Sequence, residues 1–367
     1  MLDCRPKHSL VMFIVIVLIL LISITPLQVN SDIVFKGVQR LRLRIYGYIF
    51  NNGTSPIPVN DTDLLIFDYP IRTLGQKVDG VKAWVDEKEY NYTLENDDGS
   101  VSLIINAPEI ENATIEPGQE MEAGVEYNVT VNLTARILSA IGIISATNLT
   151  ELISQSGSWS DIPSIDEKYV EKTVMWNYSN PLIRLLVKYI ERQGRDKPLI
   201  AVLSAIKWLD DNIVYKTRIP PRHPWEVVLE GAGDCDDQSN LLITILRSMG
   251  VPSYLEVGMV WVNNSFNMTN TGANGHITYT FIGGGGHGWV VAYIPPWGWV
   301  RIDMTVSLGT GIDHIRYAAY YITPIVVTAN VTKGDYATSS AHFTEEVEEK
   351  ELYYRLYVEI YNYDAEK

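Results

Sequence analysis

A glycine-rich turn that runs directly into an amphipathic helix is the feature that most constrains how this chain folds. Residues Gly231–Gly233 lead to Cys235, and apolar residues then recur at helical spacing: Leu241, Leu242, Ile245 and Leu246. The pattern predicts a helix with Cys235 in its first turn, where free backbone N–H groups and the helix dipole favour a thiolate. The alternative is a buried cysteine that packs as a small apolar side chain. The polar neighbours of Cys235 favour a reactive thiol over an apolar packing role.

Composition indicates a folded protein of two or three domains. The chain has 367 residues, of which 46% are hydrophobic and 20% charged. The formal net charge is −15, and the sequence has no long basic patch. These values exclude nucleic acid as a partner.

An uninterrupted apolar run, Ser9–Ile24, lies near the N-terminus and extends without charge to Val29, which gives about the 20 residues needed to span a bilayer. Arg5 and Lys7 precede it and predict a cytoplasmic N-terminus with the body outside the cell. A cleaved signal peptide is the alternative, but no A-x-A-like site follows the run. We therefore expect a single-pass cell-membrane anchor.

Cysteines and glycosylation acceptors agree with an extracellular body. Cys4 precedes the apolar run, so Cys235 is the only thiol of the body and no internal disulfide is expected there. Asn-x-Ser/Thr triplets, typical of a glycoprotein, occur only after the run, at Asn52, Asn60, Asn91, Asn112, Asn128, Asn132, Asn148, Asn177, Asn263, Asn267 and Asn330.

The pattern of apolar residues predicts four segments. Residues 1–30 form the cytoplasmic tip and transmembrane anchor, and residues 31–136 a β-sandwich of short alternating strands that begin at Val38. Residues 137–330 form an α+β core with helices after Pro181 and Pro198. Residues 331–367 comprise an acidic stretch and a strand, Leu352–Tyr361.

Two residues could complete a catalytic site with Cys235. A cysteine nucleophile needs a base and a third group that orients the base. His287 and Asp303 lie on predicted strands joined by the short turn Pro295–Gly298. Antiparallel pairing around this turn would bring the two side chains together, facing the Cys235 helix.

Three sequence blocks resemble the transglutaminase-like superfamily, especially its microbial and archaeal members. They are Gly233–Asp237 with its exit at Leu246–Pro252, then His287–Tyr293, and then Gly298–Thr305. The resemblance implies a papain-like transglutaminase core, in which the cysteine helix packs on an antiparallel sheet. It also implies Cys235 as nucleophile, His287 as general base and acid, and Asp303 as the orienting carboxylate.

Other side chains are weaker candidates. Trp225 and Gln238 are candidates for a second oxyanion donor beside the Cys235 backbone N–H, and Trp289 for a wall of the cleft. The carboxylates Asp234, Asp236 and Asp237 lack an EF-hand pattern, so we interpret them as solvated capping residues. A zinc site of Cys235, His276 and His287 is disfavoured, because structural zinc usually takes two or more cysteines. We expect no metal and no cofactor.

The function expected from these features is that of a cysteine protease or amidase, or of a protein-glutamine acyltransferase. The thiol would form a thioester with a peptide or protein substrate, and hydrolysis is favoured over transfer to an amine. The alternative is a non-catalytic surface module that binds peptide or glycan. The sequence does not determine the oligomeric state.

Overall fold

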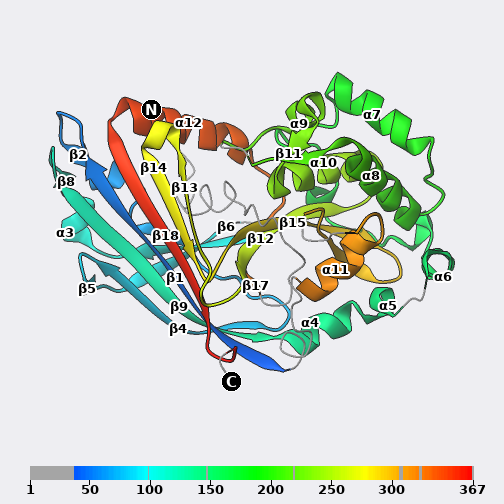
Figure 1. Ribbon diagram of the computed structural model, residues 1–367, viewed down its shortest axis with the longest axis horizontal. Coiled ribbons are helices and arrows are strands. Elements are labelled where there is room, and N and C mark those ends of the chain that lie inside the picture. Colours follow the sequence, from blue (N-terminus) through cyan, green and yellow to red (C-terminus); the bar gives the residue numbers. More distant parts are fainter. Residues whose placement is uncertain are drawn as a thin grey trace.

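Two seven-stranded sheets form the framework of the protein. The computed structural model describes residues 37–365 except 98, 146–147, 218–219, 306–308 and 322–324. Figure 1 shows the first sheet on the left, under α12 (Tyr336–Glu349), and most other helices on the right. A continuous core of buried apolar side chains includes residues from both sheets and from the helices.

The first sheet combines strands from both ends of the chain. Its order is β13 (Asn267–Gly272), β14 (Ile277–Ile282), β18 (Leu352–Asn362), β1 (Val38–Asn51), β9 (Glu120–Asn132), β4 (Gln76–Val85) and β5 (Lys88–Glu89). Buried and half-buried residues alternate along β1 and β18, as expected for strands with one face on the core. The predicted C-terminal strand is therefore confirmed, and it lies inside this sheet.

The second sheet carries the candidate site. Its order is β16 (Gly298–Ile302), β15 (Gly284–Ile294), β12 (Ser253–Trp261), β17 (Ile325–Val331), β7 (Ser100–Ile105) and β3 (Ile66–Asp68), and β6 (Tyr92–Asp97) also pairs with β7. All of these pairs are antiparallel. The expected antiparallel sheet of the core is therefore present, with β15 almost entirely buried.

The described α-helices besides α12 are α7 (Pro181–Glu191), α8 (Pro198–Asn212), α9 (Pro224–Glu230), α10 (Cys235–Ser248) and α11 (Asp313–Tyr321), with the short α3 (Pro108–Glu111), α4 (Leu133–Ser139), α5 (Ile141–Ile144) and α6 (Leu149–Gln155). Of these, α10 packs against β12 and β15 of the second sheet, and α11 packs against β16. The predicted start of α7 is confirmed: Pro181 occupies the first turn, and the Asn180 side chain accepts a hydrogen bond from Leu182 N at 2.9 Å.

Two minor pairs of strands complete the fold. The antiparallel pair β2 (Ile57–Pro58) and β8 (Thr114–Ile115) lies outside both sheets, as does the parallel pair β10 (Val214–Tyr215) and β11 (Ala232–Gly233). The parallel pair matters for the site because β11 leads directly into α10.

Strands of the predicted β-sandwich do not form sheets of their own. β1, β4 and β9 share the first sheet with β13 and β14, whereas β3 and β7 join the second sheet through β17. Sequence alternation could find these strands but not their partners, because pairing depends on contacts between residues far apart in the chain. The proposed boundary at residue 136 therefore does not separate the sheets.

The predicted transmembrane segment, Ser9–Ile24, lies outside the described residues. Within the part of the chain that is described, no helix has the length and apolar character needed to cross a bilayer.

Candidate active site

Cys235 is the first residue of α10, as the sequence pattern predicts. A left-handed Gly231 (φ 63°) ends α9, and β11 then brings the chain to the helix. A Cβ at Gly233 would lie 2.7 Å from the Cβ of Asp237, so only glycine fits this close entry. The Cys235 side chain is 1% exposed, and the backbone of Gly288 lies close enough to affect the pKa of its thiol.

His287 and Asp303 form a buried hydrogen-bonded pair. Strands β15 and β16 are antiparallel, with Val290 opposite Ile302, and this register brings the two side chains together on one face. His287 Nε2 lies 2.5 Å from Asp303 Oδ2. Because Gly288 follows His287 directly, the thiol lies beside the histidine strand. The described contacts include no hydrogen bond between the Cys235 sulfur and the imidazole.

Asp303 is held in its ionised form. Burial alone would raise the pKa of this carboxyl, but the imidazole of His287 and two hydrogen bonds from Thr305 outweigh burial and lower the pKa. The Thr305 backbone N–H and hydroxyl donate to Asp303 Oδ1 at 2.9 and 3.1 Å. An ionised Asp303 keeps the proton of a neutral His287 on Nε2, so Nδ1 is left as the basic nitrogen.

The backbone of Asp303 is held by His314 of α11. Asp303 N donates to His314 O at 3.0 Å, and His314 Nδ1 lies 3.0 Å from Asp303 O. The other ring nitrogen, Nε2, lies 2.6 Å from Asp210 Oδ1 of α8. His314 is 2% exposed, so its ring is buried together with these contacts. No local pattern pointed to this role, because both partners are distant in sequence.

The surroundings of Cys235 favour the neutral thiol. Burial raises the pKa of the thiol well above its usual value, and the charges of Asp236 and Asp234 raise it further; the Gly288 backbone opposes this shift. The helix dipole therefore does not produce the thiolate that the sequence pattern suggested.

The three carboxylates around Cys235 are buried, which corrects their interpretation as solvated capping groups. Asp234, Asp236 and Asp237 are 1%, 2% and 0% exposed. Burial and the neighbouring carboxylates raise the pKa of Asp236 well above its usual value and that of Asp237 to about 7. One ligand oxygen from each lies within 4.8 Å of the others, so these are the described residues that could hold a metal ion.

The weaker candidates occupy different environments. Gln238 Nε2 donates to Gly233 O at 2.9 Å, and Trp225 stacks on His223 with ring centroids 4.2 Å apart. Trp289 is fully buried, and its Nε1 donates to Glu256 Oε2 at 2.8 Å. The donors of Gln238 and Trp289 thus already have partners inside the protein.

His276 lies directly before β14 of the first sheet and does not complete a zinc site. Its Nδ1 lies 3.0 Å from Leu352 O, and its ring stacks on Tyr353. It belongs to no described group of converging metal ligands that also contains Cys235 and His287.

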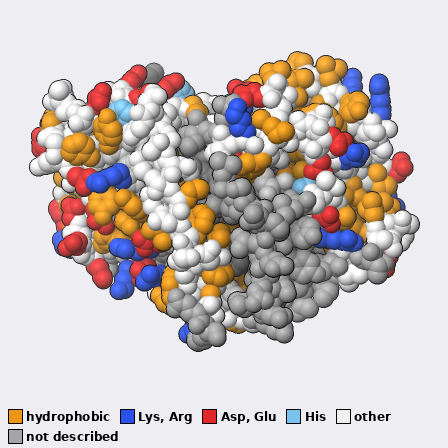
Figure 2. All heavy atoms as spheres, in the orientation of Figure 1, with side chains coloured by type: hydrophobic (Ala, Val, Ile, Leu, Met, Phe, Trp, Pro, Cys, Tyr) orange, Lys and Arg blue, Asp and Glu red, His pale blue; other side chains and the backbone are white. Residues whose placement is uncertain are grey.

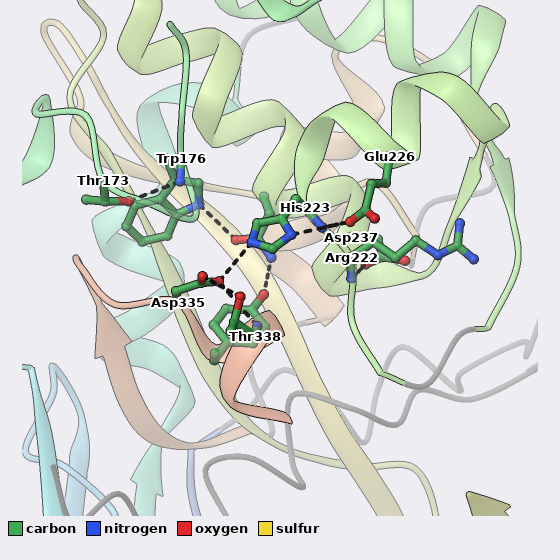
Figure 3. Close-up of polar contacts among 10 residues, drawn as sticks. Thr173, Trp176, Arg222, His223, Glu226, Asp237, Asp335 and Thr338 are labelled. Carbon is green, nitrogen blue, oxygen red and sulfur yellow. Dashed lines mark hydrogen bonds and ion pairs between the residues drawn. The ribbon is translucent and has the colours of Figure 1, made fainter. Parts of the chain in front are cut away.

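The start of α12 contacts α10 and the N-terminus of α9. His223 Nε2 lies 3.0 Å from Asp335 Oδ1, as Figure 3 shows. The next residue, Tyr336, donates to Asp236 Oδ2 at 3.4 Å and accepts a hydrogen bond from Asn240 Nδ2. Asn240 Oδ1 in turn accepts from Trp176 Nε1 at 2.8 Å. These buried contacts fix the first turns of α10.

The comparison with protein families confirms the resemblance. Residues 187–304 match the model of the transglutaminase-like superfamily. The matched segment contains α8, α9 and α10, strands β12 to β16, and the residues Cys235, His287 and Asp303. The likeness to this superfamily therefore covers residues 187–304.

Solved structures extend the likeness beyond that segment. A candidate cysteine protease from Cytophaga hutchinsonii is 11% identical, with 89% of this chain and 92% of that chain covered and a TM-score of 0.52. At this identity the match shows a shared fold. None of the curated proteins compared with the chain matches it.

Two further structures are matched with lower scores. The periplasmic domain of TgpA from Pseudomonas aeruginosa is 13% identical, with 75% of this chain and 92% of that chain covered and a TM-score of 0.28. Red sea bream transglutaminase is 11% identical, with coverages of 84% and 61% and a TM-score of 0.27. TM-scores this low do not show that these two structures share the fold of this chain.

Proposed function

We propose that this protein is a cysteine enzyme that cleaves amide or isopeptide bonds of a peptide or protein substrate through a thioester on Cys235. One observation carries the proposal: the buried His287–Asp303 pair lies one residue from Gly288, whose backbone approaches the Cys235 thiol and whose O accepts a hydrogen bond from Ser239 Oγ of α10 at 3.2 Å. This arrangement supports Cys235 as the nucleophile, His287 as the base and Asp303 as the orienting carboxylate.

The proposed reaction has two stages. Cys235 Sγ attacks the carbonyl carbon, and its proton passes to His287 Nδ1 while Asp303 stabilises the imidazolium. His287 then protonates the leaving amine, which leaves a thioester. Water attacks the thioester with His287 as base, which releases the acid and restores the thiol. Transfer to a second amine instead of water would give a crosslink.

A thiol that is neutral at rest fits this sequence of steps. Because burial and the aspartates raise the pKa of Cys235, its proton would leave during the attack and not before it. The backbone N–H of Cys235 belongs to the first turn of α10 and is our candidate oxyanion donor. Since the side chain is 1% exposed, substrate binding would have to uncover the sulfur.

The same exposure favours a second candidate function. A cysteine that stays covered cannot react, and the fold would then serve as a non-catalytic module that binds peptide or glycan at the cell surface.

A thiol-reactive amide mimic discriminates between the two functions. In a Cys4→Ser background, Cys235 is the only thiol, so labelling is unambiguous. We expect one label per folded molecule, its loss in His287→Ala, and its retention in His276→Ala, where the substituted histidine lies directly before β14 of the first sheet. Failure to label the folded protein, or equal labelling of the His287→Ala variant, would reject the proposal that the protein is an enzyme.

The proposed location is the cell membrane, with the body outside. The support is the sequence itself: the apolar run Ser9–Ile24 follows Arg5 and Lys7. Protease added to intact cells should digest the body and leave the first residues protected. Digestion only after lysis would reject this topology.

A further inference from the structure

The outward face of α7 has an unusual composition for so acidic a chain. Two parallel stripes run along it at four-residue spacing, a cationic stripe and an apolar stripe. We call these six residues the α7 face: Arg184, Lys188 and Arg192, and Pro181, Leu185 and Tyr189. Leu185 is 67% exposed and Tyr189 55%. The opposite side of the helix is buried in the core.

The cations of the α7 face have no carboxylate partner among the described residues. The nearby Glu191 pairs with Arg195, at 2.5 Å, and the other described ion pairs use none of the three cations. Like charges at four-residue spacing repel each other and destabilise a helix. A negatively charged surface would relieve that repulsion.

Local charge differs in sign from that of the whole chain. Residues 181–207 contain six Lys or Arg and two Asp or Glu, a local net charge of 6 − 2 = +4, whereas the whole chain carries −15. The positive charge is therefore concentrated on and next to α7. Figure 2 shows Lys and Arg side chains beside apolar ones at the upper right, where Figure 1 places this helix.

Apolar surface continues from Tyr189 toward α6 and α8. A cavity of about 330 Å³ lies beside Tyr189, and its lining includes Ile153, Ile200 and Leu203. Leu149, at the start of α6, also lines it and is 43% exposed. The exposed Leu and Tyr of the α7 face thus belong to a wider apolar area.

We propose that the α7 face docks on a membrane that contains anionic lipids. Each Lys or Arg near such a surface contributes favourable electrostatic energy, and exposed Leu and Tyr side chains insert at the boundary between headgroups and acyl chains. A protein partner typically contacts about 20–30 residues a side, whereas the α7 face has six and is convex. A bilayer needs no matching shape.

Spin labelling at position 185 tests the proposal in the full chain. Leu185→Cys is labelled with a nitroxide after replacement of both native cysteines by serine (Cys4→Ser, Cys235→Ser). Vesicles are made of phosphatidylcholine alone or mixed with phosphatidylglycerol. We expect the label to become protected from an aqueous relaxant and accessible to oxygen only with phosphatidylglycerol, and high salt to reverse this change.

Charge variants supply the matched control. The triple variant Arg184→Glu, Lys188→Glu, Arg192→Glu should reduce lipid contact of the label by about tenfold or more. The same reversal at Arg72, Lys77 and Lys82, which are exposed on or next to β4, should not. A label at Leu74, 59% exposed, should stay in water throughout.

Three outcomes would overturn the proposal. In the first, the label at position 185 stays in water on anionic vesicles. In the second, the label contacts lipid equally on vesicles without phosphatidylglycerol. In the third, charge reversal at Arg72, Lys77 and Lys82 reduces lipid contact as strongly as charge reversal on the α7 face. Protection by a soluble acidic protein with no protection by vesicles would identify a protein partner and would also reject a membrane.

Discussion

The carboxylates on the two sides of Cys235 differ in protonation, although all are buried. On the side of β16, Asp303 has a lowered pKa because His287 and Thr305 stabilise its charge against the effect of burial. On the side of α10, burial and the neighbouring Asp234 raise the pKa values of Asp236 and Asp237. Partners, and not burial alone, decide which carboxylate is charged.

This difference separates two roles. A charged Asp303 can stabilise an imidazolium during the reaction, whereas the raised pKa of Asp236 opposes a negative charge beside the sulfur. The two sides also respond oppositely to pH. The stability that Asp303 contributes is lost as pH falls through its lowered pKa, and the stability linked to Asp237 is lost as pH rises through about 7.

The largest expected effect is that of Asp303→Asn. An amide cannot stabilise the imidazolium and can hold the wrong tautomer, so the rate of Cys235 labelling by the amide mimic, or kcat/KM on an identified substrate, should fall by about 10³-fold. Asp236→Asn should change the same rate by less than about tenfold. Equal losses in the two variants would remove the distinction between the two sides.

Asp237→Asn should change how stability depends on pH. The pKa of Asp237 is raised from its ordinary value of 3.8 to about 7, so the folded state binds the proton more tightly. Stability should therefore fall by about 4 kcal/mol between about pH 4 and pH 8, at 1.36 kcal/mol per pKa unit. Urea unfolding across this range should show a smaller fall in the variant. Asp196→Asn, an exposed control, should match the wild type; if Asp237→Asn matches it too, the carboxyl is ionised in the fold.

Sequence alone predicted the local parts of this structure. The strict alternation of β1 and the capped start of α7 depend on neighbours in the chain, and both are confirmed. The spacing around Pro295–Gly298 also predicted that β15 and β16 pair. These features need only short-range rules.

Tertiary contacts account for what the sequence missed. Asp236 and Asp237 look like helix-capping acids, and nothing near them in sequence indicates that Tyr336 and Arg222 cover them. The same holds for His314, whose partners Asp210 and Asp303 come from two other elements. Burial, which reverses the protonation of these groups, is a property of the assembled fold.

His314→Gln should have an intermediate effect on kcat, through its contact with Asp303. His314 holds the backbone of Asp303 and is itself oriented by Asp210, so its loss should misalign the carboxylate without removing it. We expect kcat to fall about 10-fold to 100-fold with KM within about threefold, as for loss of an orienting partner. Unchanged kcat in a folded variant would make His314 a packing residue only, and a parallel rise in KM would indicate a general distortion.

Tyr336→Phe should have the smallest effect, and the substitution changes the surroundings of Asp236 on α10. The substitution removes the hydroxyl that donates to Asp236 and leaves Asn240 Nδ2 without this acceptor. A buried group that loses its partner costs about 1–3 kcal/mol, so urea unfolding should show a loss near the lower end of this range. Tyr363→Phe, at a ring that is 40% exposed, should show no loss of stability.

Labelling of Cys235 in the Tyr336→Phe variant should change less than about threefold, because Tyr336 contacts α10 and not the His287–Asp303 pair. A rate loss comparable to that of Asp303→Asn would mean that the protonated carboxylates take part in the chemistry.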